Sequence, residues 1–346
     1  MSKSQARVTI VISTYNRPDT LCVVIRSVIL QTFSNWKILV IGDHCNPETE
    51  EVVTSFNDSR IQYINLPHRT GSQSGPNSVG IALAATEYLA FMNHDDVWLQ
   101  DHLEHAIETL EKTKKDFFIG KCAFTHHSPL ILGNLKVPKF YFASPDNRTA
   151  DMSFDKINII FESASSWVIK TTHAKKIGYW KDSREIHRTP LQNWIIRAWR
   201  NKTKFVFGDK ITVLNITPYQ PKTSKTLYSI KSSAHTYILS LLENQNSNSV
   251  RDYVEKSLEH NKEHIDVETK VLERYPKVFR KILMNKFTKS ICKYTGLDSF
   301  EIFYTFIGLE KGRHMKQLSV DRTGETLPEK IHIKKIIDAV NSDTGH

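Results

Sequence analysis

The first part of the chain alternates short apolar runs with longer amphipathic stretches. Apolar residues predominate at positions 8–12, 36–41, 61–66 and 88–92, and each gap between runs is long enough for a helix. In the first gap, apolar side chains recur three or four positions apart over Leu21–Ile29, which is the period of an α-helix. Strands that alternate with helices predict a parallel sheet covered by helices on both faces. The expected fold class is therefore α/β.

The pattern continues less regularly up to about residue 217. Periodicity predicts helices over 102–113 and 190–200, and strands over 117–124, 167–170 and 205–216. We therefore expect further strands to extend the same sheet.

The sequence pattern changes near residue 220 and divides the chain into two parts. Pro218 and Pro221 end the α/β pattern, and helical periodicity dominates from there onward. We expect an α/β domain over residues 1–220 and a helical C-terminal region over residues 221–346. A length of 346 residues agrees with about two domains.

Composition and charge exclude several classes of protein. Hydrophobic residues make up 40% and charged residues 24% of the chain, as in ordinary globular proteins. The net charge of +10 favours anionic partners, but no basic block interleaved with aromatic residues predicts nucleic-acid binding. No apolar run reaches the ~20 residues of a membrane span, and the first residues lack the apolar core of a signal peptide. The four distant cysteines show no metal or redox spacing.

One basic amphipathic stretch lies close to the end of the sequence. Lys334 and Lys335 are flanked by Ile333, Ile336 and Ile337. This pattern fits either a helix on an anionic membrane surface or an ordinary helix with a solvated face. We expect a cytoplasmic protein, with peripheral contact at the inner face of a membrane as the second reading.

Polar and acidic residues follow three of the predicted strands. The segment Ser13–Arg17 follows the first strand, Asp43 the second, and Asp95 and Asp96 the fourth. In an open parallel sheet these ends share one edge, where such sheets bind ligands. Carboxylate oxygens at that edge suit a divalent cation that in turn holds phosphates. The alternative is that the two adjacent acids only cap the next helix. A nearby Gly-containing loop with Arg69 would add a cation for a nucleoside diphosphate.

Four segments together resemble the inverting glycosyltransferases of family 2, which have the GT-A fold. The segments are Val-Ile-Ser-Thr-Tyr-Asn-Arg-Pro at 11–18, Val-Ile-Gly-Asp-His at 40–44, Ser-Gly-Pro-Asn-Ser-Val-Gly-Ile at 74–81 and Asn-His-Asp-Asp-Val-Trp at 93–98. The resemblance covers about residues 6–217. It implies metal-assisted transfer of a sugar from a nucleotide-diphospho-sugar, most often a UDP-sugar, to a hydroxyl of a glycan or lipid-linked acceptor. A single displacement would invert the anomeric centre.

The resemblance also implies which side chains bind the donor. Ser13 and Tyr15 would frame the nucleotide base, and Asp43 would accept its ring N–H. Asp95 would reach the ribose or the metal and take part in catalysis, while Asp96 would be the main ligand of Mn²⁺ or Mg²⁺. The other expected donor-binding residues are Arg17, Arg69, Gln73 and Asn77.

The sequence departs from the family pattern at two positions. Asn93 stands where the acidic motif commonly begins with Asp, and Asn193 stands where the family has its general base. Asn cannot take a proton from a hydroxyl at neutral pH. His187, just upstream, is the best substitute because imidazole titrates near neutral pH, and Asp182 and Glu185 come next. The alternative function is a catalytically degenerate domain that binds nucleotide-sugars or a partner without turnover.

Overall fold

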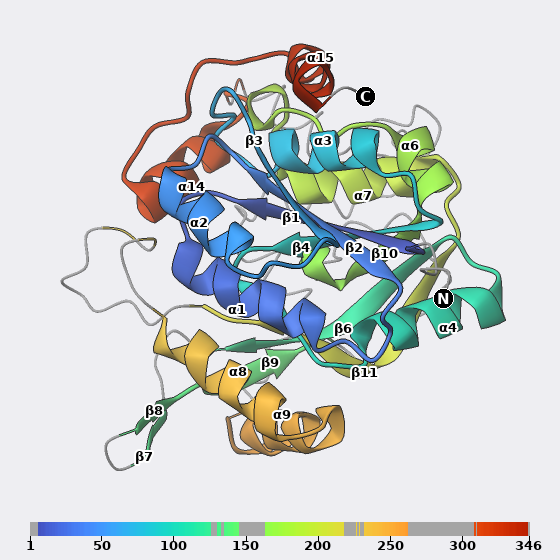
Figure 1. The fold of residues 1–346 in the computed structure, drawn as a ribbon, viewed down its shortest axis with the longest axis vertical. Coiled ribbons are helices and arrows are strands. Elements are labelled where there is room, and N and C mark those ends of the chain that lie inside the picture. The colour runs from blue at the N-terminus through green and yellow to red at the C-terminus, as the bar shows by residue number, and fades with distance from the viewer. Residues whose placement is uncertain are drawn as a thin grey trace.

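The main feature of the computed structural model is a nine-stranded sheet with helices on both faces (Figure 1). The structure describes residues 6–125, 130–132, 135–144, 163–217, 226, 228, 232–261, 308 and 310–344. The strand order is β3-β2-β1-β4-β10-β6-β11-β5, and β9 pairs with β6 outside this path. A separate two-stranded sheet consists of β7 (Leu130–Leu132) and β8 (Leu135–Val137).

The first half of the sheet is parallel, as its apolar pattern predicts. Its strands are β1 (Val8–Thr14), β2 (Trp36–Gly42), β3 (Ile61–Asn65) and β4 (Tyr88–Asn93). The connecting helices are α1 (Pro18–Ile29), α2 (Pro47–Thr54) and α3 (Ser74–Leu83). Pro18 and Pro47 each occupy the first turn of a helix, where a missing N–H costs nothing.

Beyond Asn93 the sheet becomes mixed. The remaining strands are β5 (Asp96–Trp98), β6 (Phe117–Thr125), β9 (Phe140–Ala143), β10 (Trp167–Lys170) and β11 (Phe205–Asn215). β10 runs antiparallel between β4 and β6, and β5 runs antiparallel to β11. The helices in this half are α4 (His102–Thr113), α6 (Thr171–Ile177) and α7 (Pro190–Arg200). The predicted α/β class is confirmed, but the sequence pattern did not predict β5.

Each face of the sheet buries its own apolar core. Successive side chains of a strand point to opposite faces, so Val11 and Phe91 pack with α3, α6 and α7. Ile10, Ile12 and Met92 point the other way and pack with α1, α2 and α4. All five side chains are at most 1% exposed. The two cores fix the sheet firmly between its helical layers.

Of the described C-terminal helices, one joins a core of the sheet and two form a third core with its edge strands. They are α8 (Ser233–Asn244), α9 (Ser247–Asn261), α14 (Arg313–Thr323) and α15 (Ile333–Thr344). α8 and α9 pack on β5, β9 and β11, whereas α15 places Ile336, Ile337 and Val340 in the core beside α3. The expected boundary near residue 220 falls within 218–225, outside the described residues.

The basic amphipathic stretch near the end of the sequence turns its apolar side inward. Ile336 and Ile337 are buried, while Lys334 and Lys335 are exposed. The structure therefore matches the reading of an ordinary helix with a solvated face. In the described part of the chain, no helix combines the length and apolarity that a membrane crossing requires.

We expect Ile336→Ala to lower the free energy of unfolding by ~2–5 kcal/mol, because the truncated side chain would leave a cavity in the core. Lys335→Ala, on the exposed side of the same helix, is the matched control and should change little. Chemical denaturation of the full chain measures both variants. Equal stability of the two variants would mean that α15 does not pack into this core.

Candidate active site

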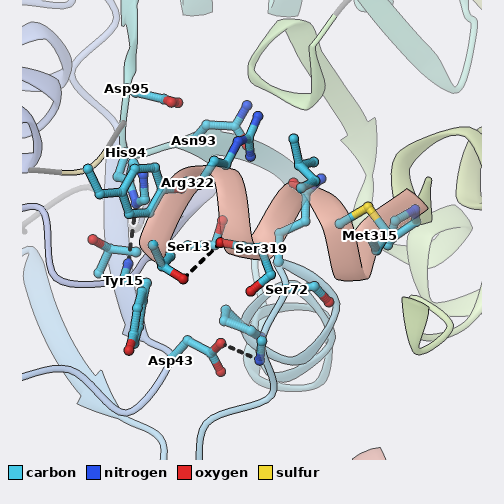
Figure 2. A pocket seen from close by; sticks show the side chains of 18 of the residues that line it. Ser13, Tyr15, Asp43, Ser72, Asn93, His94, Asp95, Met315, Ser319 and Arg322 are labelled. Carbon is cyan, nitrogen blue, oxygen red and sulfur yellow. Dashed lines mark hydrogen bonds between the residues drawn. The ribbon is translucent and has the colours of Figure 1, made fainter. Parts of the chain in front are cut away.

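β1, β2 and β4 end together at one edge of the sheet. In the parallel register, Ser13 lies beside Ile41 on one side and Asn93 on the other. This edge borders a cavity of ≈ 380 Å³, within the ~300–1,000 Å³ typical of ligand sites. The strand-end residues on its lining are Ser13, Thr14, Tyr15, Asp43, Asn93, His94 and Asp95 (Figure 2). The strand ends therefore converge as the alternating pattern predicts.

Asp43 holds the loop that faces the strand ends. Its carboxylate accepts hydrogen bonds from the backbone N–H and the hydroxyl of Thr70, both at 2.7 Å, and from the Gly71 N–H at 2.8 Å. Gly71 has a φ of +80°, and a Cβ there would lie 2.6 Å from Pro328, so glycine is required. Burial raises the pKa of Asp43 although these hydrogen bonds oppose the shift. The conformation of the loop that carries Arg69 thus depends on a buried acid at the end of β2.

The two adjacent carboxylates after β4 have different surroundings. Asp95 lines the cavity, whereas Asp96 begins β5 and is 1% exposed. Asp96 Oδ1 accepts from Asn215 Nδ2 at 2.7 Å, and Oδ2 accepts from Asn93 Nδ2 at 2.9 Å and from the Ser165 hydroxyl. Burial and the charge of Asp95 raise the pKa of Asp96 to about 7. Asp96 is therefore hydrogen-bonded away from the cavity lining in this structure, and its expected role as main metal ligand stays a prediction.

The turn that carries Asp95 is fixed from two sides. His94 is buried, and its Nδ1 accepts from the Tyr15 N–H at 3.3 Å. Burial lowers the pKa of His94 to about 4, so its ring is neutral at physiological pH. From α8, His235 donates its Nε2–H to the backbone carbonyl of Asp95 at 2.9 Å. The C-terminal region thus helps to position the carboxylate that faces the cavity.

Three arginines lie around this edge, and they differ in burial and in their contacts. Arg17 is 1% exposed and off the lining, with its guanidinium carbon 5.2 Å from the centre of the Tyr228 ring. Arg69 lines the cavity and forms an ion pair with Glu325 at 2.5 Å. Arg322 reaches the lining from α14.

Positive charge keeps the Asp95 carboxylate ionised. Burial acts to raise the pKa of Asp95, but the neighbouring His94, Arg322, His235 and Arg17, in that order, lower it below its ordinary value. Asp95 therefore presents a negative charge to the cavity at neutral pH.

Most of the expected donor-binding side chains belong to the lining. They are Ser13, Tyr15, Asp43, Arg69, Gln73 and Asp95. Arg17, Asn77 and His187 do not belong to it. Asn77 is 1% exposed inside α3, and His187 is half-buried in the turn before α7. The structure thus brings together the residues from the strand ends and the loop, but not the expected base.

The start of α7 reaches the cavity without an acid. Thr189 lines the cavity and caps the helix, because its hydroxyl accepts from the Gln192 N–H. Asn193 lies further along α7, and its Oδ1 accepts from Arg197 Nε at 3.1 Å. Upstream, Asp182 and Glu185 are both engaged in ion pairs. Among the described lining residues, α7 and the turn before it therefore contribute no acid or histidine.

Residues of the C-terminal region complete the cavity and were not expected from the sequence. They are Tyr228, Met315, Leu318, Ser319, Arg322 and Thr323. Those in α14 recur every three or four positions, which is one face of a helix. Because Ser, Arg and Thr belong to this stripe, a search for apolar periodicity does not detect it.

The oxygen donors at the cavity fit a divalent cation that arrives with phosphates. Asp95 offers one carboxylate to the cavity, and the described residues contain no group of three or more His, Cys, Asp or Glu side chains that could hold a metal. Mg²⁺ is commonly bound through one or two carboxylates together with substrate phosphates. Asp95 is therefore sufficient for such a cation only when a ligand supplies the other oxygens.

Comparisons with known proteins show which sequences and folds this chain resembles. Residues 9–178 match the family model described as Glycosyl transferase family 2. The chain is 29% identical over 124 residues to the UDP-Glc:alpha-D-GlcNAc-diphosphoundecaprenol beta-1,3-glucosyltransferase WfgD of Escherichia coli, covering 36% of this chain and 49% of the relative. It is 31% identical over 172 residues to the enzyme of the same description WfaP, also from Escherichia coli, covering 50% of this chain and 64% of the relative. The chain thus spans about half or somewhat more of these curated relatives.

Solved structures show the same fold over most of the chain. The crystal structure of S. aureus TarS 1–349 aligns with a TM-score of 0.51 at 14% identity, covering 98% of this chain and 92% of that chain. The complex of TarS 1–349 with UDP-GlcNAc aligns with a TM-score of 0.50 at 16% identity, covering 80% and 79%. At these identities the likeness concerns the fold alone. The protein therefore has the GT-A fold, and its residues 9–178 match the model of glycosyl transferase family 2.

Proposed function

We propose that the protein is a glycosyltransferase that moves a sugar from a UDP-sugar to a hydroxyl of a lipid-linked or glycan acceptor. The observation that carries the proposal is the cavity at the carboxyl ends of β1, β2 and β4 in a family 2 domain. The names of WfgD and WfaP, which describe UDP-Glc donors and a diphosphoundecaprenol-linked acceptor, support a UDP-sugar donor and a diphospho-lipid acceptor. The TarS complex with UDP-GlcNAc supports the same class of donor.

The nucleoside would bind on the Asp43 side of the cavity. Tyr15 presents an aromatic ring there, with the Arg69 guanidinium carbon 4.4 Å from the ring centre. Asp43 Oδ2 accepts from the Gly71 N–H, and a carboxylate oxygen has capacity for a second hydrogen bond. A ring N–H of the base would be that second donor. This arrangement favours a base that presents an N–H, such as uracil.

The diphosphate would then lie toward Asp95. Members of the family commonly use a divalent cation, and Asp95 would hold it together with the phosphates. When bound, the cation supplies positive charge that stabilises the departing nucleoside diphosphate. Asp96 would support this arrangement indirectly, because its hydrogen bonds with Asn93, Ser165 and Asn215 fix the turn between β4 and β5.

Activation of the acceptor hydroxyl requires a further residue, the general base. Inversion by a single displacement requires a base that deprotonates the acceptor hydroxyl. His187 stays the proposed base by its position before α7, although it is half-buried and off the described lining. The hydrogen bond between Asn193 and Arg197 favours a second candidate function, nucleotide-sugar binding without turnover.

Product analysis separates the two functions. The full chain is incubated with UDP-Glc or UDP-GlcNAc, Mn²⁺ and a diphosphoundecaprenol-linked sugar, and both UDP release and the glycosylated product are measured. We expect acceptor-dependent UDP release and a product with an inverted anomeric centre. Donor binding without release for every acceptor would favour the second candidate. A chain that binds neither UDP-sugar would contradict both.

We expect Asp43→Ala to weaken UDP binding roughly ten- to a hundredfold, because a hydrogen bond to a charged group is worth ~1.5–3 kcal/mol. The change would also release the loop that Thr70 and Gly71 anchor to this carboxylate. Isothermal titration calorimetry measures the affinity. Asp58→Ala, which removes an aspartate paired with Arg60 away from the cavity, is the control. A dissociation constant for Asp43→Ala equal to that of the wild type would remove Asp43 from the site.

The two adjacent acids should give opposite phenotypes. We expect Asp95→Ala to abolish the Mn²⁺-dependent increase in UDP affinity while leaving the thermal midpoint close to that of the wild type. Asp96→Ala should instead cost at least ~1–3 kcal/mol of stability, because it leaves buried donors unpaired, and should keep the Mn²⁺ dependence. Thermal unfolding with and without UDP and Mn²⁺ measures both. The reverse pattern would restore Asp96 as the main metal ligand.

A further inference from the structure

Helix α14 forms one wall of the cavity although it lies outside the matched family domain. Its lining residues are Met315, Leu318, Ser319, Arg322 and Thr323, which share one face of the helix. The opposite face, which includes Arg313 and Lys316, is exposed. Figure 2 shows α14 lying across the cavity, with Arg322 on the side of Asn93, His94 and Asp95.

The position of α14 is fixed at both ends by contacts with the rest of the chain. Before the helix, the Gly312 N–H donates to the Ile186 carbonyl at 3.0 Å. A Cβ on Gly312 would lie 2.9 Å from the Arg184 Cα, so the backbones approach closely. After the helix, Arg184 donates to the Pro328 carbonyl, and Lys330 pairs with Glu185. The same short segment, 184–186, therefore anchors both ends of the helix.

Of the three arginines described at this edge, Arg322 is the one that lines the cavity on the side of Asp95 (Figure 2). Arg17 is buried and off the lining. Arg69 is on the lining, but its charge is paired with Glu325, which also accepts from the Tyr15 hydroxyl at 2.9 Å. Arg322 lines the cavity, its side chain is hydrogen-bonded to Tyr228, and its charge acts on the Asp95 carboxylate.

A diphosphate brought to Asp95 requires compensating charge. A carboxylate such as that of Asp95, on the cavity lining, would repel phosphate oxygens by itself. A guanidinium can bind phosphate with two parallel hydrogen bonds, and its charge does not depend on pH in the physiological range. Arg322 would bring such a group to the cavity from a helix that begins more than a hundred residues after the family domain ends.

We propose that Arg322 binds the diphosphate of the donor opposite Asp95, so that α14 completes the donor site. The inference rests on the proposed function, because it assumes that the cavity takes a nucleoside diphosphate. It assigns a ligand-binding role to the C-terminal region. Docking of α14 then becomes a requirement for donor binding.

The test compares UDP with uridine, which lacks the phosphates. In the full chain with Mn²⁺, we expect Arg322→Ala to weaken UDP binding roughly ten- to a hundredfold, as for loss of a hydrogen bond to a charged group. Uridine binding should stay unchanged.

Arg322→Lys keeps the charge and should lose less UDP affinity than Arg322→Ala. Arg313→Ala, on the exposed face of the same helix, is the matched control and should bind UDP like the wild type. Calorimetry measures UDP, and ligand-observed NMR measures uridine.

The outcomes separate this inference from the proposed function. Wild-type UDP affinity in Arg322→Ala would overturn the role of Arg322 and leave the donor site intact. An equal loss of UDP and uridine binding, or a large fall in the thermal midpoint shared by both Arg322 variants, would mean that Arg322 only supports the fold. A wild-type chain that binds no nucleoside diphosphate would overturn the proposed function itself.

Discussion

The parallel register of β1 with β2 and β4 is the constraint on which the site depends. It sets Ser13 beside Ile41 and Asn93. The positions of the residues that follow these strands are determined by this register. The register is strongly specified because both faces of the strands are buried, and a slip by one residue would move each apolar side chain to the wrong core. Two well-packed cores therefore determine where three short polar segments meet.

The three strand-end acids show that position alone does not determine chemistry. Asp43 is held by the N–H groups of a loop and fixes that loop. Asp95 faces the cavity among positive charges that keep it ionised. Asp96 faces inward to three donors, and its pKa is raised to about 7. One edge of the sheet thus carries an acid that holds a loop, an acid that faces the cavity and an acid that is hydrogen-bonded away from it.

Local signals in the sequence predicted much of this arrangement, and non-local contacts account for the rest. The α7 helix was predictable with its bounds, because Pro190 and the apolar spacing mark it. The inward orientation of Asp96 could not be predicted, because it depends on pairing between β5 and β11, which lie more than a hundred residues apart.

The place of Arg322 on the cavity lining could not be predicted either. The face of α14 that carries it is partly polar and borders a cavity made by distant strands. Asn193 stays the residue expected at the position of the family's base, and its hydrogen-bond partner Arg197 could not be inferred from the sequence.

Hydrogen exchange of the full chain with and without UDP and Mn²⁺ tests the central claim most directly, because local protection reports which segments a ligand stabilises. The account predicts slower exchange at the ends of β1, β2 and β4, in the loop 69–73 and in α14, all within the same titration. Protection confined to other segments, or no protection at saturating UDP, would contradict it.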